Sequence, residues 1–133
     1  MNTNENITKH FSRAELACRH CGELHMDQKF LEKLELVRMA FGKPMIITSG
    51  YRCEEHNAAV SEGRQLGAHT LGFAVDVAIS GEDVPKLIEL ALKFGFTGFG
   101  LKQHGPIQGR YVHLDTVSLG SQKIPRPRLW TYP

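Results

Sequence analysis

With 133 residues, of which 41% are hydrophobic and 23% charged, the chain fits one globular domain, residues 1–133, that can bury a core of its own. The formal net charge is only +2 and the densest basic stretch is short, residues 123–128, which argues against nucleic acid as the main partner. No run of about 18 apolar residues is present, so we expect no membrane span.

Helical signals come first along the chain. Ser12 and Glu15 have the spacing of a capping box, which predicts a short helical turn. From Asp27 to Phe41, apolar residues recur at helical spacing with charged residues between them, and Gly42 ends this predicted helix. Residues 45–49 are rich in β-formers and predict a short strand.

A polar segment separates this strand from the next one. Residues 51–64 predict a loop, with a helical turn over residues 54–60. Residues 73–79 alternate and predict a strand whose bulky apolar side chains share one face. Asp76 lies on the opposite face, where its companions are alanines, so space is left around its carboxylate.

The remaining elements are one helix and two strands. Residues 84–94 predict a helix, residues 98–101 and 110–115 predict strands, and residues 102–109 predict the loop between these strands. The proline-containing tail is expected to be extended on the surface. Short strands with few helices between them favour an α+β fold, a small antiparallel sheet with flanking helices.

Two histidines and one aspartate form a candidate metal site. Gly72 allows the chain to turn between His69 and Asp76, so their side chains can converge. His113 lies in the last predicted strand, on the same face as Tyr111 and Asp115. Two imidazoles and a carboxylate are a frequent catalytic zinc set, which leaves one position for water with a pKa near 7. Spacing alone does not decide the matter, because the chain has seven histidines.

Three ordered blocks resemble one family. Residues 69–76 match the pattern His-x-x-Gly-x-Ala-x-Asp of the D-alanyl-D-alanine carboxypeptidase-like zinc metallopeptidases, a superfamily that includes lysostaphin-type peptidases and the hedgehog signalling domain. Residues 49–57 look like the upstream block of that family, and residues 111–116 look like its closing histidine strand. The ending, residues 126–132, is similar to small phage and bacterial members, so the resemblance spans about residues 10–132.

The resemblance implies a fold like that of the hedgehog domain and the D-Ala-D-Ala peptidases, a cofactor, and roles for several residues. It makes His69, Asp76 and His113 the ligands of Zn²⁺. It makes Arg52 a residue that binds a substrate carboxylate or polarises the scissile carbonyl, which suits the fixed fork of donors of arginine. The implied substrate is the stem peptide of peptidoglycan.

The chain departs from the family at positions that bear on proton transfer. Ala68 stands where many relatives carry serine, and Arg110 stands where carboxypeptidase members often carry the acidic general base. Asp115 is the leading substitute, with orientation of a neighbouring side chain as its equally weighted alternative. His104 is the other catalytic candidate. Tyr111, which stands where those members carry a histidine, could bind substrate by donating to the oxyanion.

A second group of possible metal ligands involves the cysteines. Cys18 and Cys21 form a Cys-x-x-Cys pair with His20 between them, and Cys53 follows later. Such a set can form a structural zinc site, but one pair is a weak signal and buried free thiols are the favoured interpretation. The odd number of cysteines does not indicate a disulfide framework.

The functional expectation is a zinc peptidase of peptidoglycan, a D,D-carboxypeptidase or an endopeptidase of the endolysin type. The alternatives are a non-catalytic, zinc-containing module that binds the cell wall, and a redox or metal-handling protein centred on Cys18 and Cys21. We expect a monomer that acts on the cell wall. Because no apolar signal segment is present, we expect it to be cytoplasmic until released, for example as a phage-type lysis or tail protein.

Overall fold

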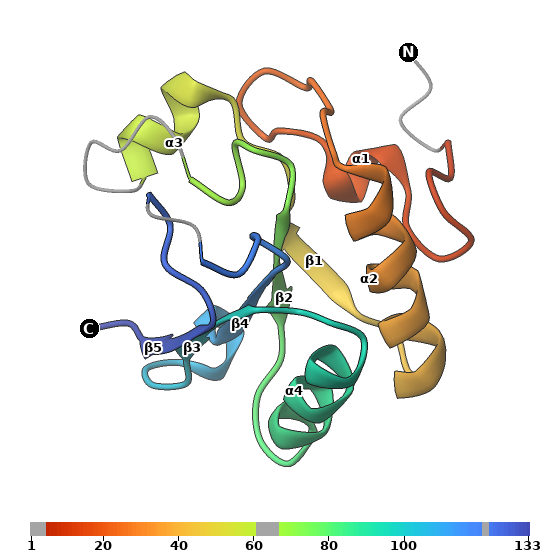
Figure 1. Cartoon of the computed structure of the whole chain (residues 1–133), viewed down its shortest axis with the longest axis vertical. Coiled ribbons are helices and arrows are strands. Elements are labelled where there is room, and N and C mark those ends of the chain that lie inside the picture. Colours follow the sequence, from red (N-terminus) through yellow and green to blue (C-terminus); the bar gives the residue numbers. More distant parts are fainter. Residues whose placement is uncertain (1–4, 61–66, 121–122) are drawn as a thin grey trace.

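The computed structural model describes residues 5–60, 67–120 and 123–133, and in them the chain forms four α-helices and one five-stranded sheet (Figure 1). The helices are α1 (Arg13–Leu16), α2 (Gln28–Phe41), α3 (Glu54–Val60) and α4 (Asp83–Lys93). The strands are β1 (Ile46–Ser49), β2 (Ala74–Ala78), β3 (Gly98–Lys102), β4 (Tyr111–Asp115) and β5 (Arg128–Thr131). A 3₁₀ turn, η1 (Ile107–Gly109), lies between β3 and β4.

The sheet has the strand order β1-β2-β4-β3-β5. Strands β1 to β4 pair antiparallel, and β5 joins the edge parallel to β3. Strand β4 is central, and its pairing with β2 places His113 directly opposite Asp76. The sheet therefore brings together two residues that are distant in the sequence.

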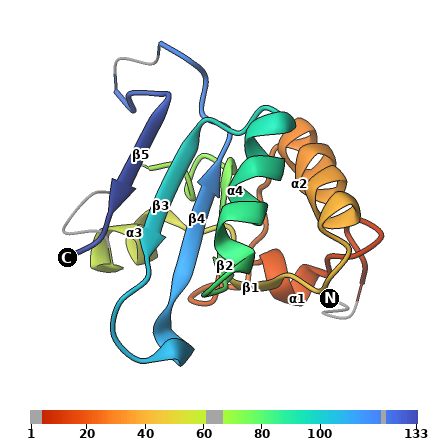
Figure 2. The ribbon, with the colours of Figure 1, turned by 90° about the horizontal axis from the view of Figure 1, so that it is seen from below.

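One face of the sheet carries the hydrophobic core. Figure 2 shows α2 and α4 side by side on this face. The strand residues that point toward them alternate with those of the opposite face, as the period of two requires. The core on this side is built from Phe30, Leu34, Val37, Val75, Val77, Leu87, Phe99, Val112 and Leu114. The other face is left for polar residues, and α3 lies on that side of the molecule (Figures 1 and 2).

The long helices begin and end near the predicted residues. The side chain of Asp27 accepts a hydrogen bond from the backbone N–H of Phe30, which caps α2, and Gly42 ends the helix with φ 73°. Ser12 and Glu15 form the capping box expected for α1. Helix α4 begins at Asp83, with Glu82 as an N-cap whose side chain makes no capping hydrogen bond.

The expected α+β fold is confirmed, with one strand added. An extended tail was predicted from the sequence, but β5 was not, because this strand is short and lies among prolines. The sheet is therefore mixed, not wholly antiparallel. The end of the loop predicted for residues 51–64 lies outside the described residues, from residue 61 onward. Within the described ranges, no helix is long and apolar enough to span a membrane.

Candidate metal centre

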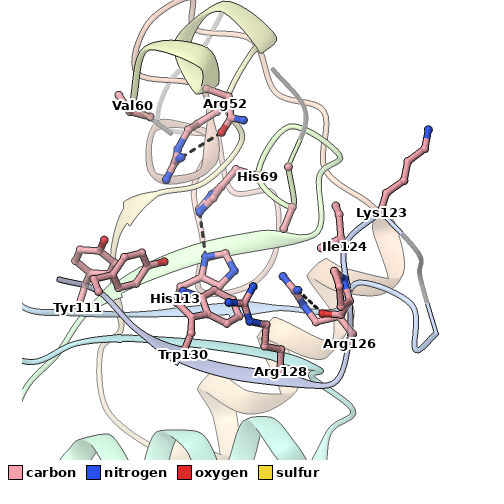
Figure 3. Close-up of a pocket in the computed structure, with 15 residues that line it drawn as sticks. Arg52, Val60, His69, Tyr111, His113, Lys123, Ile124, Arg126, Arg128 and Trp130 are labelled. Atoms are coloured by element: carbon pink, nitrogen blue, oxygen red, sulfur yellow. Dashed lines mark hydrogen bonds between the residues drawn. The ribbon is translucent and has the colours of Figure 1, made fainter. Parts of the chain in front are cut away.

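His69, Asp76 and His113 converge on the polar face of the sheet. Asp76 and His113 face each other from β2 and β4, and His69 reaches them from the turn that precedes β2. All three are buried, with relative exposures of 5%, 6% and 5%. Figure 3 shows the rings of His69 and His113 pointing toward each other.

The three facing atoms form a regular triangle. The Nδ1 atom of His113 lies 3.2 Å from the Nε2 atom of His69 and 3.2 Å from the Oδ1 atom of Asp76. The Nε2 atom of His69 is also 3.2 Å from the same carboxylate oxygen. The structure therefore brings together the three metal ligands that the sequence predicted.

The second nitrogen of each ring is already engaged outside the triangle. The Nδ1 atom of His69 lies 2.8 Å from the Gly50 carbonyl oxygen, so it must donate its proton there. The Nε2 atom of His113 lies 2.7 Å from the Asp115 carboxylate and donates to it in the same way. In neutral rings, the nitrogens that face the triangle are then acceptors beside a carboxylate oxygen. Three acceptors at this distance need a cation between them.

The pKa directions differ among the three residues of the triangle. Burial lowers the pKa of His69, which keeps its ring neutral. Burial alone would raise the pKa of Asp76, but His69 and His113 outweigh it and hold the pKa well below its usual range. Burial would lower the pKa of His113, but the hydrogen bonds of Asp115 and Asp76 raise it.

Zinc fits this donor set. Zinc bonds are about 2.0–2.1 Å long to imidazole nitrogen and about 2.0–2.2 Å long to carboxylate oxygen, so ligands at tetrahedral angles lie about 3.3–3.5 Å apart. The observed separations of 3.2 Å match this spacing closely. Two imidazoles and one carboxylate would supply three ligands to a zinc ion and leave its fourth position open, which is typical of catalytic zinc.

Asp115 lies behind His113 and is fully buried. Besides His113, it accepts hydrogen bonds from Arg126, whose Nη2 atom lies 2.6 Å from Oδ2 and whose Nε atom lies 2.9 Å from Oδ1. Burial would raise the pKa of Asp115, but Arg126 and His113 lower it to about 2. Both carboxylate oxygens are occupied, so this position favours orientation of His113 over proton exchange with a substrate.

Trp130 packs against the imidazole ring of His113. Its ring centroid lies 5.1 Å from that of His113, and the Arg126 guanidinium lies 5.0 Å from the Trp130 ring. Gly98 and Gly100 of β3 provide the room for this layer, because a Cβ at Gly98 would collide with the Asp115 carboxylate. A Cβ at Gly100 would lie 2.7 Å from the Trp130 ring. The C-terminal segment thus completes the support of His113.

Arg52 lies beside the triangle, on the segment that follows β1. Its Nη2 atom donates to the Oδ2 atom of Asp76 at 3.2 Å, its Nη1 atom to Asn57 at 3.2 Å and its Nε atom to Ser49 at 3.1 Å. The guanidinium therefore fixes the second oxygen of a candidate metal ligand. It also lines the cleft described next.

A cleft of about 610 Å³ opens above His69 and His113. Figure 3 shows Arg126, Arg128 and Lys123 along one side of it and Arg52 across from them. None of the described residues that line this cleft is an aspartate or a glutamate. The cleft is therefore cationic, which suits an anionic group such as a peptide carboxylate.

Tyr111 and Tyr132 form one end of the cleft, with ring centroids 5.3 Å apart. Burial raises the pKa of both phenols above the usual value, so both keep their protons at neutral pH. Two protonated phenols thus line the same cleft as His113. Tyr111 is where the sequence placed a substrate-binding residue.

His104 is not brought to the site. It is exposed in the loop between β3 and β4, and its Nε2 atom lies 3.0 Å from the carbonyl oxygen of Pro133. It does not line the cleft, as far as the described residues define it. Of the three residues that the sequence analysis named as catalytic, Arg52 and Asp115 lie at the site.

Several residues of the site received no role from the sequence. Arg126, Arg128, Trp130 and Tyr132 all lie in the C-terminal segment, which the sequence analysis described only as an extended tail similar to that of small family members. The sequence did contain a sign that this segment has a role. Residues 123–133 include three cations and two aromatic residues, which is unusual for a tail without a role. Only the pairing of β5 with β3 shows where these side chains lie.

Comparison with known proteins agrees with the site. A family model described as Peptidase M15 matches residues 9–115, which include all three residues of the triangle. The chain belongs to the peptidase M15 family, as the resemblance to D-alanyl-D-alanine carboxypeptidase-like peptidases indicated. The segment that carries β5 follows the matched residues. Comparisons with curated proteins and with solved structures gave no match.

Proposed function

We propose that the chain is a zinc peptidase that hydrolyses amide bonds in the stem peptides of peptidoglycan. The observation that carries the proposal is the buried triangle of His69, Asp76 and His113, with all sides 3.2 Å, at the floor of a cationic cleft. Bound zinc would supply Lewis-acid chemistry and a water whose pKa is near 7. The family supplies the reaction class, amide hydrolysis.

The residues around the triangle have distinct tasks in this proposal. Gly50 and Asp115 fix the two imidazoles with the correct nitrogen turned toward the metal. Arg52 holds Asp76 and offers its positive charge to a substrate carboxylate or to the scissile carbonyl. Tyr111 and Tyr132 place phenol donors where negative charge develops on the carbonyl oxygen.

The charge of the cleft supports a stem peptide as substrate. Stem peptides carry carboxylates, and Lys123 and Arg128 line the cleft, which has no aspartate or glutamate among its described lining residues. Arg52 lines it too and is paired with Asp76. Arg126 also lies there but is paired with Asp115. The peptide bond that is cut, terminal or internal, is a matter for product analysis.

The test is digestion of purified peptidoglycan by the wild type, His113→Ala and His104→Ala. We expect new amino termini or free D-alanine from the wild type and from His104→Ala, because His104 lies outside the cleft. We expect none from His113→Ala. Release that survives in His113→Ala would contradict the proposal.

The second candidate function is a non-catalytic, zinc-containing module that binds the wall. It is favoured by one observation, that no aspartate or glutamate lines the described part of the cleft to act as general base. Zinc-loaded protein that sediments with peptidoglycan but releases no product from any wall type would establish this function instead.

A further inference from the structure

The three cysteines gather at one place, although the sequence separates Cys53 from the other two by more than thirty residues. Their sulfur atoms all lie within 4.8 Å of one another. Cys18 is buried, Cys53 is partly exposed and Cys21 is exposed. The cluster thus has a buried floor and an open side through which an ion can enter.

The backbone around the cluster is arranged to stabilise thiolates. The N–H of Cys53 donates to the Cys18 sulfur, and the N–H of His56 donates to the Cys53 sulfur, both at 3.4 Å. The loop itself is closed by two backbone hydrogen bonds of 2.8 Å, from Gly22 to Cys18 and from Cys18 to Glu23. Hydrogen bonds to sulfur of this kind favour the charged form of the thiol.

The acidities of the thiols agree with this geometry. Burial alone would raise the pKa of Cys18, but backbone N–H donors, that of Cys53 first among them, lower it to about 7. The backbone at Glu23 lowers the pKa of Cys21, but burial and the neighbouring sulfurs outweigh it and raise the pKa. Three sulfurs so close together therefore need a cation if all are to be thiolates.

We propose that Cys18, Cys21 and Cys53 bind a structural zinc ion, at a site separate from the triangle of His69, Asp76 and His113. Zinc–sulfur bonds of about 2.3 Å at tetrahedral angles place the sulfurs about 3.8 Å apart, which is within the observed limit. The Nδ1 atom of His20 lies 3.5 Å from the Cys53 sulfur and is a candidate for the fourth position. Each thiol releases its proton to solvent as the ion binds.

Such an ion would fasten the loop after α1 to the segment after β1. That segment is already attached there by the backbone hydrogen bond from Tyr51 to Leu16, 2.8 Å long. It carries Gly50, which accepts from His69, and Arg52, which holds Asp76. The proposed site therefore stabilises the part of the chain that positions the candidate metal centre.

The first experiment uses cobalt(II) as a spectroscopic probe, added to metal-free protein that has been fully reduced. Three proteins are compared: the wild type, His69→Ala and Cys21→Ser. We expect the near-ultraviolet absorption of thiolate–cobalt charge transfer in the wild type and in His69→Ala, with one equivalent of cobalt at the cluster. We expect its loss in Cys21→Ser, whose exposed side chain can change without disturbing the core. The readout needs no peptidase activity, so it is independent of the proposed function.

A second experiment guards against misfolding of the variants. Zinc is added to His69→Ala and to the double variant His69→Ala/Cys21→Ser, and thermal unfolding is followed. We expect the unfolding midpoint to rise with zinc in the first protein and to stay unchanged in the second, because only a folded site stabilises by mass action. Absence of the charge-transfer band in reduced wild type, or a band and a zinc-dependent midpoint that persist without Cys21, would overturn the proposal. A pair of cysteines that forms a disulfide and takes up no cobalt after reduction would do the same.

Discussion

At the scale of single residues, the main feature of the site is that both ring nitrogens of His113 have partners. One nitrogen faces the triangle, and the other donates to Asp115, which Arg126 in turn neutralises. A carboxylate behind a metal-binding histidine fixes the ring orientation and raises its basicity as a ligand. We therefore propose that Asp115 orients the His113 ring for a metal ion.

Replacing Asp115 by asparagine tests this role. Asp115→Asn keeps the size of the side chain but removes its charge, so we expect zinc affinity at the triangle to fall by about 10–100-fold. The measurement is competition with a chromophoric chelator in a Cys21→Ser background. The control is Asp83→Asn, which changes only a surface ion pair with Lys43. Equal affinities in both variants would contradict the role given to Asp115.

The sequence identified the three residues of the triangle but not the layer behind them. His69, Asp76 and His113 could be predicted because residues 69–76 and 111–116 match motifs of one family, whereas spacing alone left the metal site undecided. The sequence left two roles open for Asp115, general base or orientation of a neighbouring side chain. It shows that Asp115 shares a strand face with His113, but it does not show that Arg126 occupies the carboxylate oxygens. His104 could not be excluded, because nothing in the sequence says where a loop histidine points.

At the scale of elements, β3 and β5 determine the space around His113. Gly100 lies opposite His113 in the sheet and opposite Trp130 in β5, so the absence of a side chain there lets the indole lie beneath the imidazole. The pairing of β5 is parallel and non-local, and its only sequence sign was an aromatic and basic tail. Local signals predicted the antiparallel strands, for example β-forming residues at 45–49 and alternation at 73–79.

Adding one methyl group to β3 tests the importance of this space. In Gly100→Ala the new Cβ would lie 2.7 Å from the Trp130 ring, so the indole or β5 must move. We expect a loss of about 1–3 kcal/mol in the free energy of unfolding, together with weaker zinc binding. Gly109→Ala is the matched control, since its Cβ would meet only the Lys102 side chain at 3.8 Å. Denaturant titration of both variants measures their free energies of unfolding. Equal stability of the two would contradict the importance of the space at Gly100.

The N-terminal segment is attached to α2 through Glu35. Its carboxylate accepts from the Thr8 hydroxyl at 2.7 Å and from the backbone N–H of His10 at 2.9 Å, and it lies 2.5 Å from the His10 ring. Burial would raise the pKa of Glu35, but the hydrogen bonds of His10 and Thr8 lower it. A carboxylate whose pKa is lower in the folded state stabilises the fold above its unfolded pKa and loses this effect as the pH falls.

The variant Glu35→Gln should therefore show a stability defect that depends on pH. We expect the wild type to be more stable by about 1 kcal/mol at neutral pH, and the difference to shrink below about pH 4 as Glu35 becomes protonated. Denaturant titration of the wild type and the variant, at neutral pH and below about pH 4, measures the difference in the free energy of unfolding. A difference that is constant or grows in acid would show that the ionised carboxylate is not the cause.

At the scale of the whole molecule, the sheet separates two environments. One face, under α2 and α4, carries the core, and the other carries the triangle of His69, Asp76 and His113 and a cleft lined by basic residues. The chain needs no metal to bury this core, so zinc at the triangle would serve chemistry. The arrangement and the membership in the peptidase M15 family together support a metal-dependent peptidase.

The most direct test is restoration of cleavage by zinc. Chelator-treated wild type and His113→Ala receive increasing zinc, and the release of new amino termini from a D-alanine-containing stem peptide is measured, with the all-L peptide as control substrate. We predict cleavage of the stem peptide that rises with zinc in the wild type only. Cleavage without zinc, or equal restoration in His113→Ala, would contradict a peptidase centred on His69, Asp76 and His113.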